Sequence, residues 1–196
     1  IPTARKIKSF VSFWNPDGAI VECGGTASDV DPSAFGHLPV VFFDHDPRVL
    51  PANAFCVTHD SAATGRLAAR ELMEGGAANF AFVPYPHRRF WSEERERGYV
   101  EALSLNGYGC RVFSARFSAK DPTRWQRRLR EFLEGLPRPC ALFAANDSTA
   151  AEVLTAAKFV GVRVPEDLSV VGVDDAAAVC EHTEPTLSSV KPDFRR

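Results

Sequence analysis

The sequence predicts an α/β protein in which parallel β-strands are covered by α-helices. Short apolar runs alternate with helical patterns along most of its 196 residues, and this alternation is typical of parallel strands joined by crossover helices. Hydrophobic residues make up 45% of the chain, enough to bury a core at this length. Two of the predicted strands also end on polar residues, as strands do where an open α/β sheet forms a ligand crevice.

The first part of the chain carries three short predicted strands. An amphipathic segment with Ile7, Val11 and Trp14 at helical spacing precedes them, and a turn at residues 16–18 follows that segment. The strands are expected at residues 19–23, 40–43 and 55–57. The sheet of this part should therefore be small.

The second part alternates helices and strands at regular spacing. Its first helix, over residues 61–74, carries Ala and Leu at helical spacing and stops at a pair of glycines. The remaining elements follow in turn, with strands at 79–83, 110–113, 141–144 and 169–173 and helices at 91–104, 123–134 and 147–158. A change of composition near residues 75–79 indicates a crossover between two lobes.

Charge and cysteine content exclude several classes of function. The chain has 23 basic and 25 acidic residues and no long block of either sign, so any DNA binding would need another part of a longer polypeptide. Five cysteines lie far apart without metal-ligand spacing, and their odd number favours a reducing compartment. No apolar run reaches the length of a membrane span, and the first residues show no signal-peptide pattern.

Polar residues that follow two predicted strands are candidate ligands for a polyol. Asn146 offers an amide donor and an amide acceptor, with capping of the next helix as its alternative role. For its neighbour Asp147 the capping role is favoured. Asp174 can accept hydrogen bonds from two adjacent hydroxyl groups. A turn or capping role is the alternative for Asp174.

Asp44 has the same place after the strand at residues 40–43, and His45 and Asp46 adjoin it. These three residues suggest a metal site only weakly, because the spacing indicates no fourth ligand. A doubly wound enzyme built on this cluster is the rival interpretation. Because the chain contains no nucleophile elbow, phosphate-binding loop or dinucleotide motif, we expect neither catalysis nor a cofactor.

Arg95 lies in a charge-rich helix start, where most side chains are expected to be solvated. A guanidinium aimed into a cleft would instead clamp ring and hydroxyl oxygens with its fixed fork of donors. Trp91 and Trp125 offer flat faces on which a sugar ring could stack, although ordinary packing is the alternative for each.

The order of strands, helices and polar residues in the last third resembles the effector-binding domain of the LacI/GalR family, which is built like periplasmic sugar-binding proteins. The most specific stretch is GVRVPEDLSVVGVDD at residues 161–175. The resemblance implies a two-lobed fold with a mostly parallel sheet in each lobe. It places the first lobe at residues 1–78, the second at 79–184 and a return crossover at 185–196, with the opening strands of the first lobe missing.

The same resemblance implies site residues and partners. Arg95, three residues before a glycine, matches the effector-contacting arginine of the family, and Asn146, Asp174 and Asp44 match its strand-end ligands. It implies a cytoplasmic homodimeric regulator that binds a monosaccharide, with DNA contacted by a domain outside this chain. WSEERERGY and LSSVKPDF are most similar to xylose-operon regulators with an AraC-type DNA-binding domain, which suggests a pentose such as xylose. A periplasmic solute-binding protein of a sugar transporter is the alternative.

Overall fold

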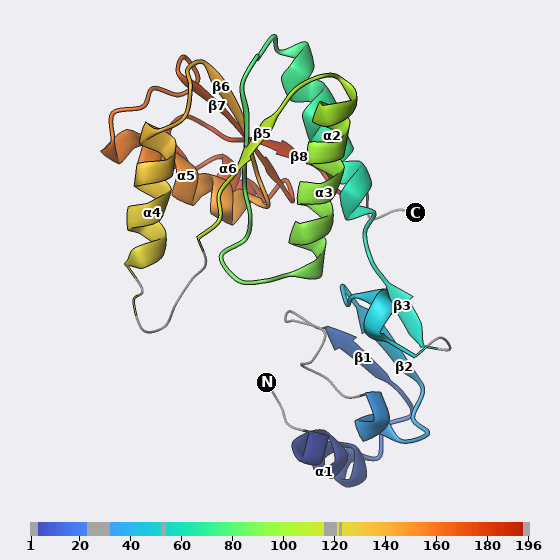
Figure 1. Cartoon of the computed structure of the whole chain (residues 1–196). Coiled ribbons are helices and arrows are strands. Elements are labelled where there is room, and N and C mark those ends of the chain that lie inside the picture. Colours follow the sequence, from blue (N-terminus) through green and yellow to red (C-terminus); the bar gives the residue numbers. More distant parts are fainter. Residues whose placement is uncertain (1–3, 23–31, 52–53, 116–120, 122, 194–196) are drawn as a thin grey trace. The chain divides into compact units, whose positions relative to one another are not determined.

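A computed structural model describes residues 4–22, 32–51, 54–115, 121 and 123–193, and divides the chain into two compact units (Figure 1). Unit 1 comprises Ile1–His59 and Arg88–Trp91, and unit 2 comprises Asp60–His87 and Ser92–Arg196. Each unit holds a sheet of parallel strands, so the α/β expectation is confirmed. Within the described ranges no helix is both long and apolar enough to cross a membrane.

Unit 1 is built on a sheet of three parallel strands in the order β1-β2-β3. Its elements are α1 (Ala4–Trp14), β1 (Ala19–Glu22), η1 (Pro32–Phe35), β2 (Val40–Phe43), η2 (Pro47–Val49) and β3 (Phe55–Val57). Ile7 of α1 and Phe35 of η1 are buried in an apolar cluster with side chains of β1 and β2. One face of the sheet is therefore covered by α1 and η1.

The other face of this sheet is apolar and exposed. Strand register aligns Ile20 with Val41 and Val41 with Phe55, so these side chains form one row across the sheet. Ile20 is 82% exposed and Phe55 is 73% exposed. Parallel sheets are usually covered on both faces, and this face of unit 1 lacks such a cover within the described residues.

Unit 2 is a five-stranded parallel sheet in the order β5-β4-β6-β7-β8. Its strands are β4 (Phe80–Val83), β5 (Cys110–Val112), β6 (Cys140–Ala144), β7 (Leu168–Val173) and β8 (Ser188–Val190). Its helices are α2 (Ser61–Glu74), α3 (Phe90–Leu105), α4 (Arg124–Glu134), α5 (Asp147–Phe159) and α6 (Ala177–Cys180). Helices α2 and α3 lie on one side of the sheet, and α4 and α5 lie on the other (Figure 1).

The strand order of unit 2 creates a switch point between β4 and β6. The chain leaves β4 for the edge strand β5 and then returns to β6 on the opposite side of β4. In open α/β sheets, ligands bind beyond the carboxyl ends of the strands at such a point. The β4 and β6 strands are buried along their whole length, which makes this part of the sheet a fixed platform.

Most elements end within a residue of the bounds that the sequence predicts. The strand expected at residues 19–23 ends at Glu22, and its last expected residue, Cys23, lies outside the described part of the chain. Two short elements, α6 and β8, were not predicted, because four and three residues are too few to show a periodic pattern.

Helices α2 and α3 touch through their backbones at two glycines. A Cβ atom on Gly98 would lie 2.1 Å from the carbonyl oxygen of Ala62, and one on Gly65 would lie 2.1 Å from the carbonyl oxygen of Arg95. Only glycine permits this approach. The close contact ties α2 to α3 within unit 2, and the lobe boundary at residue 78, which groups α2 with the first lobe, stays a prediction.

We predict that Gly98→Ala destabilises unit 2 by about 1–3 kcal/mol, because the added methyl group must push the two helices apart. Urea unfolding measures this change. Gly75→Ala is the matched control, since its Cβ would come no nearer than 3.4 Å to Leu72 O and its φ of −68° suits alanine. Equal stability of Gly98→Ala and Gly75→Ala would contradict the proposed close contact.

Candidate functional site

Arg95 lies at the carboxyl ends of the central strands of unit 2. It projects from α3, the helix that follows β4, and only 6% of the residue is exposed. Its Nη1 donates a hydrogen bond of 2.5 Å to the carbonyl oxygen of Ala145, directly after β6. Its Nη2 lies 3.5 Å from Oδ1 of Asp174, directly after β7. One guanidinium on α3 thus contacts the residues that follow β6 and β7.

Asp174 is held in an unusual backbone conformation. Its φ is 116°, and the next residue, Asp175, has a φ of 51°. Positive φ values are costly for residues other than glycine and concentrate at functional sites. Because the Asp174 side chain is 45% exposed, its carboxylate can meet both Arg95 and a ligand.

Asn146 is the N-cap of α5, and its amide oxygen accepts hydrogen bonds from Thr149 N at 3.0 Å and Thr149 Oγ1 at 2.7 Å. Of the two roles that the sequence leaves open for Asn146, ligand binding and helix capping, the amide oxygen thus has the second. Capping occupies the oxygen, so the group that Asn146 can offer a ligand is its NH₂, a donor of two hydrogen bonds.

Asp147 has a different role from the helix cap that the sequence favours. It is 1% exposed, and its carboxylate accepts hydrogen bonds from Ala176 N at 2.9 Å, Ser189 Oγ at 2.6 Å and Cys180 Sγ at 3.3 Å. Buried carboxylates need such partners. Sequence reasoning missed this cluster because its members come from α5, the β7–α6 loop, α6 and β8.

In unit 1, Asp44 ends β2 with a φ of 52°, and its backbone N–H donates to Val57 O at 3.0 Å. The next residue, His45, is 3% exposed, and its Nδ1 lies 3.1 Å from the carbonyl oxygen of Asp46. His45 Nε2 is buried and has no hydrogen-bond partner among the described residues. Unit 1 thus also has, at a strand end, an aspartate with positive φ and a buried histidine nitrogen without a hydrogen-bond partner among the described residues.

Asp46 is engaged by Arg48 rather than by a shared metal site. Two nitrogens of Arg48 each donate to the Asp46 carboxylate at 2.8 Å, and these hydrogen bonds lower the pKa of Asp46 below its ordinary value. In the part of the chain that the structure describes, no group of three His, Cys, Asp or Glu side chains is placed to hold a metal ion.

The two tryptophans lie in different surroundings. Trp91 is half-buried in the first turn of α3. Trp125 is 3% exposed, packs edge-on against Phe113 with ring centroids 4.9 Å apart, and donates from Nε1 to Glu152 at 2.6 Å. A ring enclosed in this way has no free face, so we leave Trp125 out of the site. The spacing of Trp125, Leu129 and Leu133 on one helical face was the signal for its burial.

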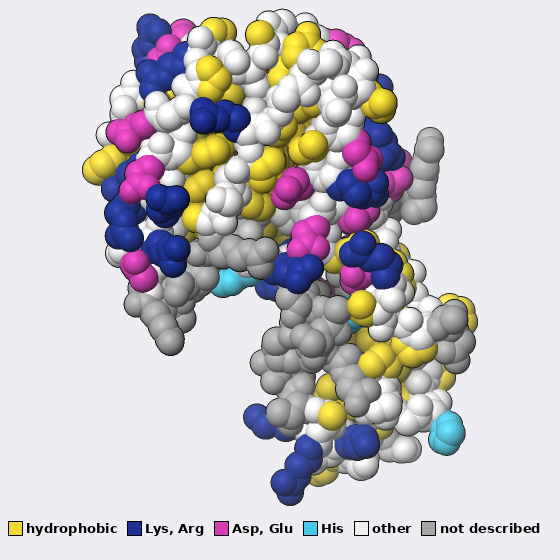
Figure 2. Space-filling view, in the orientation of Figure 1, with side chains coloured by type: hydrophobic (Ala, Val, Ile, Leu, Met, Phe, Trp, Pro, Cys, Tyr) yellow, Lys and Arg dark blue, Asp and Glu magenta, His cyan; other side chains and the backbone are white. Residues whose placement is uncertain are grey.

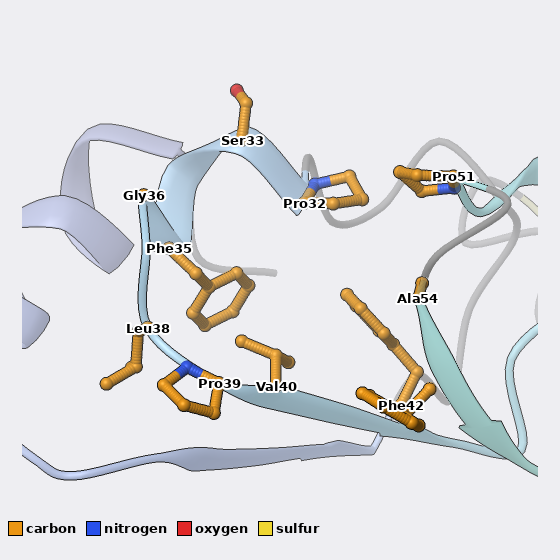
Figure 3. A pocket seen from close by; sticks show the side chains of 11 residues that line it. Pro32, Ser33, Phe35, Gly36, Leu38, Pro39, Val40, Phe42, Pro51 and Ala54 are labelled. Atoms are coloured by element: carbon orange, nitrogen blue, oxygen red, sulfur yellow. The ribbon is translucent and has the colours of Figure 1, made fainter.

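A pocket of about 390 Å³ in unit 1 lies at the opposite ends of the strands (Figure 3). Its lining includes Pro39 and Val40 at the start of β2 and Ala54 and Phe55 at the start of β3. Figure 3 shows proline and phenylalanine rings around it, with the Ser33 hydroxyl turned away from the hollow. The lining has few groups that could hydrogen-bond a polyol, so we do not place the site there.

On the face of unit 2 shown in the upper part of Figure 2, basic and acidic side chains lie next to one another. Several are paired across one helical turn, such as Arg97 with Glu94 and Glu101, and Arg128 with Glu131. This mixed surface agrees with the net charge of −2 and does not form the continuous basic stripe that binds nucleic acid.

The sequence profile of the family described as "Periplasmic binding protein-like domain" matches residues 69–196. The chain is 34% identical over 162 residues to the HTH-type transcriptional regulator CelR of Thermobifida fusca and 29% identical over 157 residues to the xylose operon regulatory protein of Haemophilus influenzae. These alignments cover 78% and 79% of this chain but 45% and 38% of the relatives. The chain thus spans about half the length of such proteins or less.

The fold is also that of a solved CelR–cellobiose complex, with a TM-score of 0.78, 27% identity, and coverage of 96% of this chain and 57% of that chain. Other matching structures are named as LacI-family regulators. The expectation of an AraC-type DNA-binding domain finds no support, because the matching regulators belong to the LacI family.

We predict that Cys180 stays unmodified by iodoacetamide at pH 8 in the folded protein. Burial, together with its hydrogen bond to Asp147, raises the pKa of the Cys180 thiol to about 11, so roughly one molecule in a thousand carries the reactive thiolate at pH 8. Mass spectrometry after timed labelling measures this, with the urea-unfolded chain as the control. Labelling of Cys180 as fast in the folded as in the unfolded chain would contradict the buried hydrogen bond.

Proposed function

Because this chain belongs to the periplasmic binding protein-like domain family, we propose that it is the sugar-sensing region of a bacterial transcription regulator. Its named relatives are regulators, and one solved relative holds cellobiose. The observation that carries the proposal is the Arg95–Asp174 pair at the switch point, with Asn146 on the next strand end. Adjacent sugar hydroxyls can accept hydrogen bonds from the Arg95 guanidinium and the Asn146 amide, and they can donate hydrogen bonds to the Asp174 carboxylate.

Sugar-binding candidates are proposed for each unit by itself. Arg95, Asn146 and Asp174 act from unit 2, and Asp44 and His45 are the candidates in unit 1. The buried, unpartnered Nε2 of His45 supports its choice, because an unsatisfied buried polar group gains from a ligand hydrogen bond. Trp91 is proposed as a stacking face for the sugar ring.

The finer ligand assignment is a monosaccharide, with a pentose such as xylose as the first choice. The similarity to a xylose operon regulatory protein supports this choice, whereas the relative bound to cellobiose makes a disaccharide the competing ligand. The protein is proposed to be a cytoplasmic homodimer that contacts DNA through a region outside this chain. Sugar binding would shift the population of its DNA-binding state through different affinities for two conformations.

A solute-binding subunit of a sugar transporter would use the same fold and a similar site. The regulator is preferred because the named relatives are transcription regulators. We do not assign catalysis, since the chemistry of the strand-end residues is that of binding and none of these relatives carries the name of an enzyme.

We predict that the intact protein binds one sugar of a panel comprising D-xylose, D-ribose and cellobiose, and that Arg95→Ala weakens this binding by about 10-fold to 100-fold. The change removes hydrogen bonds from a charged donor, which are worth about 1.5–3 kcal/mol. Isothermal titration calorimetry measures both effects. Asp174→Ala should weaken binding to a similar degree.

Arg97→Ala is the matched control for Arg95→Ala. Arg97 lies on the same helix, but it is exposed and paired with Glu94 and Glu101, so its loss should leave sugar affinity within about twofold, as expected for a surface ion pair. Failure of every panel sugar to bind would refute the proposed function. Binding that survives both Arg95→Ala and Asp174→Ala would refute the site.

A further inference from the structure

The turn after β7 has three consecutive backbone N–H groups that all donate to groups outside the turn. Asp174 N donates to Val190 O at 3.1 Å, and Asp175 N donates to Ser189 Oγ at 3.0 Å. Ala176 N donates to the Asp147 carboxylate at 2.9 Å. Since both aspartates of this turn have positive φ, these bonds stabilise a conformation that would otherwise relax.

The hydroxyl group of Ser189 links two of these contacts. It donates to Asp147 Oδ1 at 2.6 Å and accepts the hydrogen bond from Asp175 N. One hydrogen and one lone pair are thus assigned, which fixes the hydroxyl orientation. Ser189 therefore connects the buried Asp147 carboxylate to the strained turn from the edge strand β8.

Gly172 leaves the space that this arrangement needs. A Cβ atom at residue 172 would lie 2.3 Å from Asp147 Oδ1. The absence of a side chain lets the carboxylate lie directly against β7, two residues before Asp174. The turn, the carboxylate and β8 are consequently packed as one unit at the strand end.

We propose that Ser189 and Asp147 are positioning residues for sugar binding, since they hold the strained turn that presents the Asp174 carboxylate to Arg95 and to the ligand. This inference rests on the function proposed above. Neither residue needs to touch the sugar. The effect of Ser189 on affinity should pass entirely through Asp174, because Ser189 lies on β8, whereas the other ligand residues of unit 2, Arg95 and Asn146, lie on α3 and at the start of α5.

The neighbouring serines of β8 give a matched pair of variants. Ser189→Ala removes the linking hydroxyl, whereas Ser188→Ala deletes the same atom from an exposed position on the same strand. For the tightest-binding sugar among D-xylose, D-ribose and cellobiose, Ser189→Ala should lower affinity about fivefold to 30-fold. This loss is smaller than that expected for a whole hydrogen bond to a charged group, because Ser189 acts on the ligand only through the turn. Ser188→Ala should change affinity by less than about twofold.

A double-mutant cycle separates positioning from general destabilisation. In a protein that already carries Asp174→Ala, Ser189→Ala should have no further effect on sugar affinity, although its effect on the urea midpoint should remain. An equal loss of affinity in both backgrounds would overturn the proposal, as would no loss in either. Asp147→Asn provides a second variant and should also lower sugar affinity in the wild-type background, because it weakens the carboxylate that accepts from Ser189 and Ala176.

Amide hydrogen exchange tests the turn without any ligand. Exchange at residues 174–176 should become at least about tenfold faster in Ser189→Ala and remain unchanged in Ser188→Ala, because only the first loses the contact that holds the turn. If the wild-type protein binds no panel sugar, the proposed function fails, and exchange alone decides whether Ser189 holds the turn. Unchanged exchange in Ser189→Ala would refute its positioning role.

Discussion

The buried carboxylate of Asp147 organises the carboxyl end of the sheet in unit 2. A carboxylate that is 1% exposed is stable only where donors surround it, and here they come from the β7–α6 loop, α6 and β8. These donors tie together segments that are distant in the sequence. The position of Asp174, and through it the Arg95 pair, depends on this arrangement.

Two further contacts, which do not involve Asp147 or Asp174, set the position of Arg95. The close approach of α2 and α3 at their glycines holds α3, the helix that carries Arg95, against α2. The carbonyl oxygen of Ala145 holds the Arg95 guanidinium through a hydrogen bond. Ligand groups must be held within about half an ångström of their productive geometry. Backbone contacts and a carbonyl partner provide this rigidity better than flexible side chains.

Much of the fold could be predicted from the sequence, because apolar runs and helical spacing are local signals. They placed β2, β3 and α2 at their observed bounds, and the polar residues at strand ends identified Asp44, Asn146 and Asp174 as candidates. Long-range pairing was beyond such reasoning. No local pattern indicates that Asp147 meets Ser189, whereas the use of the Asn146 amide oxygen as a helix cap was among the roles that the sequence left open. The burial of Trp125 is a different case, because its spacing with Leu129 and Leu133 on one helical face is a local signal for burial.

The central claim is that Arg95 and Asp174 form the core of a sugar site at the switch point of unit 2. A crystal structure of the intact protein with the bound panel sugar tests it most directly. We predict sugar hydroxyls within about 3 Å of the Arg95 guanidinium and the Asp174 carboxylate, the normal hydrogen-bond range. A sugar bound elsewhere, for instance in the proline-lined pocket of unit 1, with both side chains uninvolved, would contradict the account.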